Sequence, residues 1–326
     1  MAKWNSPSPY LDVQTSGSTG IPKQITVRKE QMLNSARLTC DYLGLQAGDN
    51  ALLCMPLRYI AGKMMVVRSL VAGLELVVCE PTGHPMAAVD TPLRFAAMIP
   101  LQVYNTLQVP EEREKLCRTD ILIIGGGPID PALEVEIKTL PSAVYSTYGM
   151  TETLSHIALR RLNGPDASPF YTPFPSVSLS LSAEGTLVID APLIADAPLV
   201  TNDIAELLPD GCFRILGRRD NTINSGGIKI QAESVEEALR PIISTSFAIT
   251  SVPDPKFGEA IVLLITDASL PPMPEDLPKY QHPKHTLTVD AIPLTGSGKI
   301  DRVACRKLAI DMLSNRQKNI RTKGEI

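Results

Sequence analysis

The chain is arranged around one stretch, Thr15-Ser16-Gly17-Ser18-Thr19-Gly20-Ile21-Pro22-Lys23. Its hydroxyl residues compete for backbone hydrogen bonds and its glycines open unusual φ values, so neither helix nor strand is favoured here. Such a loop points N–H and O–H donors toward one place, which indicates a polyphosphate clamp. It is not a Walker A loop, because Gln24 follows the lysine. The alternative, a flexible Ser/Gly connector, is disfavoured by the hydrophobic strand predicted directly after it.

The composition is that of an ordinary globular chain. A length of 326 residues favours about two domains, and the net charge of -4 gives no sign of a nucleic-acid surface. The six cysteines contain no C-x-x-C pair and the four histidines do not cluster with them, so we expect reduced core thiols. No apolar run reaches the length of a leader or a membrane span, which predicts a cytoplasmic chain.

Apolar periodicity predicts an α/β fold. A strand at 51–54, a helix at 62–72 and a strand at 74–79 form a βαβ unit, and 92–107 repeats it, so the main sheet should be parallel. Short alternating runs between 163 and 215 indicate a smaller antiparallel β portion. We expect a large domain over 1–216, a hinge at 217–221 and a small α+β lid domain over 222–326.

Two strand ends carry candidate binding residues. The apolar strand 121–124 runs into Gly125-Gly126-Gly127-Pro128, where a flat ligand can approach the backbone; a tight strand-to-helix turn is an equally valid interpretation. The next strand, 143–147, leads into Tyr148-Gly149-Met150-Thr151-Glu152. An aromatic ring, a hydroxyl and a carboxylate suit a ring, a phosphate and Mg²⁺ respectively. The alternative here is an ordinary polar helix start.

Further candidates lie toward the C-terminus. Asp203 follows Thr201 and Asn202 and suits a sugar diol, although aspartate is commoner as a turn residue. Residues 223–230 predict a hairpin turn, and 234–239 a short helix with Glu236 and Glu237 on its polar side. Lys299 lies between two glycines before a final helix, which makes it a mobile cation.

Taken in order, these motifs resemble the adenylate-forming superfamily, which includes acyl-CoA synthetases, adenylation domains of peptide synthetases and firefly luciferase. The resemblance runs from about residue 12 to residue 310 and implies ATP and Mg²⁺ as well as coenzyme A as cosubstrate. The chain departs from most relatives in one respect: only fourteen residues precede the first stretch. We therefore expect a fold that lacks the usual N-terminal subdomain, with part of the sheet and of the active-site wall either missing or supplied by a partner chain.

The resemblance also implies residue roles. It assigns the β- and γ-phosphates of ATP to Thr15, Ser16, Gly17, Ser18, Thr19, Gly20 and Lys23. It assigns adenine and its surroundings to Gly125, Gly126, Gly127, Pro128, Tyr148, Gly149 and Met150, and the α-phosphate and Mg²⁺ to Thr151 and Glu152. It assigns the ribose to Asp203 and Arg218, the hinge to Asp220, the pantetheine tunnel to Gly226 and Gly227, and catalysis to Lys299 of the lid together with Thr151 and Glu152.

Within the superfamily, residues 56–64 and 148–160 most resemble the 2-succinylbenzoate–CoA ligases of menaquinone biosynthesis. Their substrate has an aromatic ring and a second carboxylate, so the pocket wall needs a cation. Arg68 is the candidate, and Tyr59, Lys63 and Ser155 are expected beside it. The alternative places Arg68 on a solvated helix face.

The expected activity is therefore that of an ATP-dependent acid–thiol ligase acting on small molecules, without nucleic-acid or membrane partners. Three alternatives stay open: another aryl- or acyl-CoA ligase, an adenylating enzyme that loads a carrier protein, and a non-catalytic nucleotide sensor. The sequence is compatible with a homo-oligomer.

Overall fold

The structure is a computed structural model that describes residues 4–14, 24–267, 272–295 and 300–323, the last eight of these by their backbone only. The chain divides into two compact units. The first comprises Met1–Leu181, Val188–Val200 and Leu207–Arg214, and the second Ser182–Leu187, Thr201–Glu206 and Ile215–Ile326. The predicted division at 217–221 stays a proposal.

The first unit contains a seven-stranded sheet with the order β4-β3-β5-β6-β7-β8-β9. Its strands are β3 (Asn50–Leu53), β4 (Glu75–Val78), β5 (Leu93–Met98), β6 (Thr119–Ile124), β7 (Ala143–Gly149), β8 (His156–Arg161) and β9 (Thr172–Pro173). The pairs among β3, β4, β5, β6 and β7 are parallel, as the βαβ pattern predicts, whereas β8 and β9 pair antiparallel. The α/β fold class is thereby confirmed.

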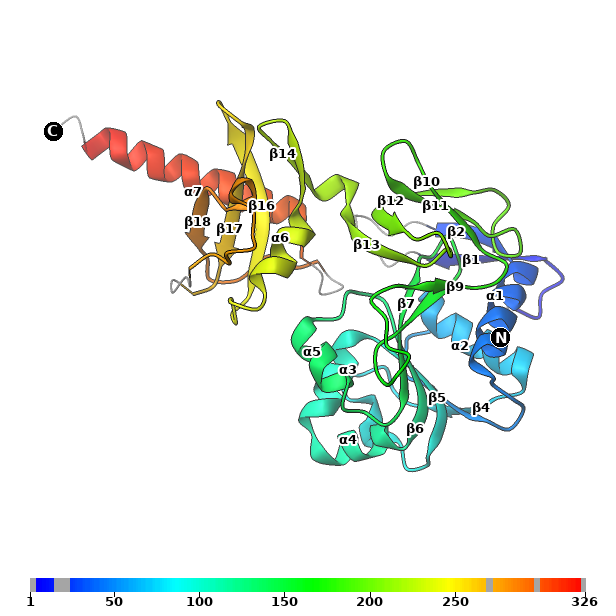
Figure 1. Cartoon of the computed structure of the whole chain (residues 1–326). Helices are drawn as coiled ribbons and strands as arrows, with labels where there is room; N and C mark the ends of the chain where they lie inside the picture. Colours follow the sequence, from blue (N-terminus) through cyan, green and yellow to red (C-terminus); the bar gives the residue numbers. More distant parts are fainter. Residues whose placement is uncertain (1–3, 15–23, 268–271, 296–299, 324–326) are drawn as a thin grey trace. The chain divides into compact units, whose positions relative to one another are not determined.

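Helices cover both faces of this sheet. They are α1 (Lys29–Leu43), α2 (Ile60–Ala72), α3 (Pro100–Gln108), α4 (Pro110–Cys117) and α5 (Pro131–Ile137), with a 3-10 turn η1 at Pro85–Ala88. Figure 1 shows α1 and α2 on one side and α3, α4 and α5 on the other. Both faces of the strands β3, β5 and β6 are largely buried, which explains why these strands are nearly continuous apolar runs.

The chain also forms two smaller sheets before the second unit's own sheet. Near the N-terminus, β1 (Tyr10–Gln14) pairs antiparallel with β2 (Gln24–Arg28) and buries Val13 and Val27. A four-stranded sheet has the order β10 (Ser178–Leu181), β11 (Thr186–Asp190), β12 (Leu199–Leu207) and β13 (Phe213–Arg218). The strands β10, β11 and β13 confirm the predicted antiparallel β portion, whereas β12 was not predicted as a strand.

The second unit contains a sheet with the order β15-β14-β17-β16 and β18 paired to β17. Its elements are η2 (Arg219–Asn221), β14 (Thr222–Ser225), β15 (Ile228–Gln231), α6 (Ala232–Leu239), β16 (Phe247–Asp254), β17 (Gly258–Ile265), η3 (Lys279–Gln281), β18 (His285–Thr288) and α7 (Arg302–Lys323). Alternate residues of β16 and β17 face opposite sides. Ile249 and Leu263 pack with α6, while Ala248 and Val262 pack with α7.

Among the described residues, no helix combines the length and the apolar composition that a bilayer crossing requires.

Candidate active site

Glycines follow the carboxyl end of β6, so the backbone there is not covered by side chains of its own. A Cβ on Gly125 would lie 2.3 Å from Thr147 Oγ1 on the neighbouring strand, so a side chain there would have to displace that hydroxyl. Gly126 has φ +87°, a conformation that favours glycine. The helix α5 begins at Pro131, and its N-cap Asp130 accepts a hydrogen bond from Ala132 N at 2.9 Å. The strand-to-helix turn is therefore present, and the adenine role of this stretch stays a prediction.

The segment after β7 is a tight turn. A Cβ on Gly149 would lie 2.2 Å from Ser155 O and 2.5 Å from the Cα of His156, both backbone atoms that cannot move aside cheaply. Thr153 is fully buried, and its hydroxyl accepts from Met150 N at 2.9 Å. No helix begins here, so the alternative of a polar helix start is wrong. The turn instead presents Thr151 and Glu152 beside the end of β7.

The Tyr148 ring is fixed by aromatic contacts. It lies 5.1 Å from the Phe213 ring, edge to face, and 5.9 Å from the Tyr171 ring. Tyr171 is itself held by a 2.9 Å hydrogen bond between its hydroxyl and Ser146 Oγ. These contacts fix an aromatic ring directly before Gly149 at the end of β7, and an aromatic ring is a group that can stack on a flat ligand.

Glu152 is exposed, and none of the described residues bonds its carboxylate. Within the described ranges, three or more His, Cys, Asp or Glu side chains nowhere gather into a metal-binding group. A single carboxylate still fits Mg²⁺, because that ion commonly takes one or two carboxylates and completes its shell with water and substrate phosphates.

The guanidinium of Arg68 is buried within the first unit. The residue is 2% exposed, and its Nη2 donates to Ser155 Oγ at 2.6 Å. No described acidic side chain forms an ion pair with it, and its Nε has no hydrogen-bond partner. Burial lowers the pKa of Arg68 to about 10, an effect that Cys40 partly opposes. The alternative of a solvated helix face is therefore wrong.

Tyr59 and Lys63 are placed differently from Arg68. Tyr59 precedes α2 as its N-cap, with the Arg58 guanidinium 4.8 Å over its ring. Lys63 Nζ donates to the backbone oxygen of Asp12 in β1 at 3.2 Å. The lysine therefore ties α2 to the N-terminal hairpin.

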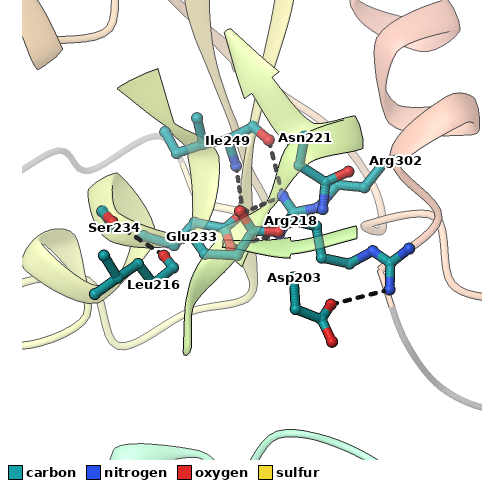
Figure 2. A network of polar contacts seen from close by, with 9 residues as sticks. Asp203, Leu216, Arg218, Asn221, Glu233, Ser234, Ile249 and Arg302 are labelled. Carbon is teal, nitrogen blue, oxygen red and sulfur yellow. Dashed lines mark hydrogen bonds and ion pairs between the residues drawn. The ribbon is translucent and has the colours of Figure 1, made fainter. Parts of the chain in front are cut away.

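Asp203 lies in β12 and not in a turn, so the turn interpretation is wrong. In the second unit, Arg218 Nη1 donates to Asp203 Oδ1 at 3.2 Å, as Figure 2 shows. The same guanidinium donates through Nη2 to Asp220 Oδ2 at 3.1 Å. Asp220 also accepts from Asn202 Nδ2 at 3.2 Å. The structure thus brings together the residues predicted for the ribose and for the hinge.

The predicted hairpin turn at 223–230 is confirmed as β14 and β15. Gly226 and Gly227 have φ +61° and +81°, and Gly226 N donates to Phe257 O at 2.8 Å. Their pantetheine role stays a prediction.

Sequence reasoning missed one buried charge network. Glu236, predicted on the polar side of α6, is 4% exposed and accepts from Arg302 and from Ile249 N. Figure 2 labels Arg302, Ile249 and Glu233 in this part of the second unit. The available signal was the spacing of Glu233 and Glu236 on one helical face.

The phosphate stretch 15–23 and Lys299 lie outside the described residues. The roles predicted for Thr15, Ser16, Gly17, Ser18, Thr19, Gly20, Lys23 and Lys299 stay predictions.

Comparison with known proteins shows which family the chain belongs to. The family described as AMP-binding enzyme matches residues 8–191. A probable 2-succinylbenzoate–CoA ligase of Mycobacterium tuberculosis (strain CDC 1551 / Oshkosh) is 28% identical over 330 residues, covering 90% of this chain and 83% of the relative. A 2-succinylbenzoate–CoA ligase of Lactococcus lactis subsp. lactis (strain IL1403) is 24% identical over 89% of this chain and 69% of its own.

Solved structures show the same likeness. An acyl-CoA synthetase (AMP-forming)/AMP-acid ligase II-like protein from Dyadobacter fermentans is 36% identical, with a TM-score of 0.65, over 93% of this chain and 91% of that one. The o-succinylbenzoate CoA synthetase of Bacillus subtilis, in complex with its acyl-adenylate intermediate, has a TM-score of 0.74 at 22% identity. It covers 90% of this chain and 68% of that one, and at that identity the likeness concerns the fold.

Proposed function

The chain belongs to the family of AMP-binding enzymes and is an AMP-forming acyl-CoA ligase, and we propose that its acid substrate is 2-succinylbenzoate. One observation supports the choice of acid: a buried guanidinium, Arg68, that has no acidic partner among the described residues. A buried charge without a partner is costly, and a ligand carboxylate would supply the missing one.

The reaction has a chemical requirement that explains the site. A carboxylate is a poor acyl donor because its leaving group would be oxide. When it attacks the α-phosphate of ATP, a mixed anhydride forms and pyrophosphate leaves; the thiol of coenzyme A then displaces AMP. Charge builds on the phosphoryl oxygens, so cations and hydrogen-bond donors are needed rather than an acid–base pair.

Each part of ATP has proposed partners in the chain. We assign the adenine to the strand-end glycines of β6 and the ring of Tyr148, and the ribose to Asp203 and Arg218. We assign the α-phosphate to Thr151 and the β- and γ-phosphates to residues 15–23. Glu152 would hold Mg²⁺, which when bound neutralises charge on the phosphate oxygens.

The acid would bind with its ring carboxylate toward Arg68 and its succinyl carboxylate toward the α-phosphate. Ser155 occupies one donor of the guanidinium at 2.6 Å, and the unpartnered Nε belongs to the same planar group. A guanidinium suits this task because its planar fork can donate two parallel hydrogen bonds to one carboxylate.

The lid domain proposed for residues 222–326 would serve the two half-reactions in turn. With Asp220 as pivot, one orientation would bring Lys299 to the phosphates for adenylation. A second would bring the Gly226–Gly227 turn to the acyl-adenylate for attack by the thiol of coenzyme A.

A panel assay tests the proposal. The purified chain is given ATP, Mg²⁺ and a set of aromatic, aliphatic and dicarboxylic acids, and pyrophosphate release is measured with and without coenzyme A. We expect 2-succinylbenzoate to have the highest kcat/KM, with its thioester as product. A stronger response to another acid overturns the substrate, a requirement for a carrier protein overturns the acceptor, and ATP binding without pyrophosphate release overturns the activity.

A further inference from the structure

A chain of hydrogen bonds leads away from Arg68 into the interior of the first unit. Arg68 Nη2 lies 2.6 Å from Ser155 Oγ, and Ser155 Oγ lies 3.2 Å from His156 Nδ1. On the other side of the ring, His156 Nε2 lies 3.1 Å from Thr39 Oγ1 in α1. His156 is 5% exposed and Thr39 is fully buried. Arg68, His156 and Thr39 are therefore buried, and Ser155, which connects Arg68 to His156, is half-buried.

The donor and the acceptor of each hydrogen bond can be assigned by starting from Thr39, at the end of the chain of bonds that is furthest from Arg68. Thr39 has a single hydroxyl proton, which it donates to Ser35 O one turn earlier at 3.1 Å. Its oxygen must then accept, so His156 carries its proton on Nε2. The Nδ1 of a neutral ring is in turn an acceptor, and the Ser155 hydroxyl donates to it. The Ser155 oxygen then presents its lone pairs to Arg68, which can only donate.

We propose that His156, as the neutral Nε2–H tautomer, is a positioning residue that orients Ser155 and thereby sets the direction of the Arg68 guanidinium. This inference rests on the proposed function, because it assigns Arg68 to the ring carboxylate of the acid. His156 itself touches no substrate. Its contribution is to fix the one hydroxyl that anchors the cation, so that the remaining donors of Arg68 point in a constant direction.

The charges around the ring support a neutral histidine. The charged group facing it is Arg68 of α2, and α1 contributes Thr39. The Cys40 thiol of α1 bonds the Arg68 backbone oxygen, and burial raises the pKa of this thiol to about 11. The ring of Phe174 lies 5.6 Å away and adds no charge. A second proton on His156 would place two cations on one serine oxygen and reverse the bond from Ser155. Burial first, and Arg68 second, hold the pKa of His156 well below its ordinary 6.5.

Two variants with one control separate positioning from general structural support. His156→Leu removes the acceptor for Ser155, whereas His156→Asn retains an oxygen acceptor close to the Cβ. Thr119→Val is the control, because it also removes a fully buried hydroxyl, but one without a hydrogen-bond partner.

The readout is kcat/KM in the adenylation half-reaction for 2-succinylbenzoate and for benzoylpropionate, the same acid without its ring carboxylate. We expect His156→Leu to lose about tenfold on 2-succinylbenzoate and little on benzoylpropionate, the scale of one charge-assisted hydrogen bond. His156→Asn should recover most of that loss, and Thr119→Val should change neither acid. Equal losses on both acids, or no recovery with asparagine, overturn the inference.

A spectroscopic measurement does not depend on the substrate. Nitrogen-15 spectra of histidine-labelled wild-type protein, assigned with His156→Asn, should show Nε2 protonated and Nδ1 unprotonated for this ring below pH 6.5. A ring protonated on Nδ1 or on both nitrogens overturns the inference, whichever acids the enzyme accepts. Absence of activity on 2-succinylbenzoate with the expected tautomer would overturn the proposed substrate instead.

Discussion

Arg302 and Glu236 are joined by two parallel hydrogen bonds inside the second unit, with Nη1 2.5 Å from Oε1 and Nη2 2.8 Å from Oε2. Arg302 Nη1 also donates to Ile249 O at 2.9 Å, and Ile249 N donates back to Glu236 at 2.7 Å. The pair therefore joins the start of α7, the helix α6 and the strand β16. Burial by itself would lower the pKa of Arg302, but the bonds and charge of Glu236 outweigh it and raise that pKa.

Breaking this pair should destabilise the second unit strongly. Glu236→Gln leaves the buried guanidinium with Glu233, 3.6 Å away, as its remaining counter-charge, so the variant should cost up to about 3–5 kcal/mol of unfolding free energy. Hydrogen exchange of the β16 amides measures that loss. The control is Arg306→Gln, since Arg306 pairs with Glu259 from a side chain that is 47% exposed, and we expect it to cost less than about 1 kcal/mol. Similar losses in both variants would contradict a special role for the Arg302–Glu236 pair.

Stability should depend on pH through His156. Its folded pKa lies well below 6.5, so between these two values the unfolded chain binds a proton that the folded chain does not. The contribution of His156 to the free energy of unfolding is therefore fully present above pH 6.5. Below that pH the free energy of unfolding decreases, with a limiting slope of about 1.4 kcal/mol per pH unit. Urea unfolding across this range measures the slope. His156→Asn should lower it, and an identical slope in both proteins would contradict the assignment.

Some features of the fold could be predicted from local sequence patterns. The parallel strands were predictable because each is an apolar run of strand length that a helical pattern separates from the next. The hairpin at Gly226 and Gly227 was predictable because the required φ values belong to glycine. Such features are determined by residues that are close together in the sequence.

Local patterns could not place Glu236 or Arg68, and Arg68 was assigned to the pocket wall only through the resemblance to the 2-succinylbenzoate–CoA ligases. Each has a polar side chain on a helix, so local periodicity predicts exposure for both. Glu236 is buried because its partner Arg302 lies 66 positions further along the chain, and Arg68 because Ser155 lies 87 positions away. Burial of a charge depends on such distant partners, and a single sequence does not reveal which residues fold together.

The hinge assignment predicts an unequal effect on the two half-reactions. Asp220 is the middle residue of the 3-10 turn η2, a conformation that proline tolerates, so Asp220→Pro should fold but restrict rotation there. Because proline also removes the bonds to Arg218 and Asn202, Asp220→Ala is the matched control. We expect Asp220→Pro to retain acyl-adenylate formation and to lose thioester formation, and Asp220→Ala to retain both. Rapid-quench assays of each step measure this, and equal losses in the proline variant would argue against a pivot at Asp220.

Arg68 should determine which acids the enzyme accepts. Arg68→Met retains most of the buried volume but removes the charge, so KM for 2-succinylbenzoate should rise by about 10- to 100-fold, the equivalent of 1.5–3 kcal/mol. Benzoylpropionate, which lacks the ring carboxylate, should be little affected. Lys63→Met is the comparison, because Lys63 Nζ binds the Asp12 backbone oxygen and should not discriminate between the acids. If Arg68→Met raised KM for both acids alike, Arg68 would have no place in acid selection.

The last prediction concerns Lys299, which precedes Arg302 by three residues. The Arg302–Glu236 pair fixes the start of α7, and Gly296 and Gly298 flank the lysine in the segment before it. A lysine tethered in this way would neutralise phosphate charge that is greatest in the transition state, so its loss should lower kcat more than it raises KM.

We expect Lys299→Ala to slow adenylation at least about a hundredfold, the scale for deleting one pre-organised transition-state donor. The same variant, given preformed acyl-adenylate and coenzyme A, should form thioester at nearly the wild-type rate, because the lysine is not needed once pyrophosphate has left. Lys307→Ala, an exposed lysine of α7, is the control and should affect neither step. Single-turnover assays of the two half-reactions measure both parts. Normal adenylation in Lys299→Ala would show that Lys299 is not catalytic, and a matching loss of thioester formation would show that it acts in both steps.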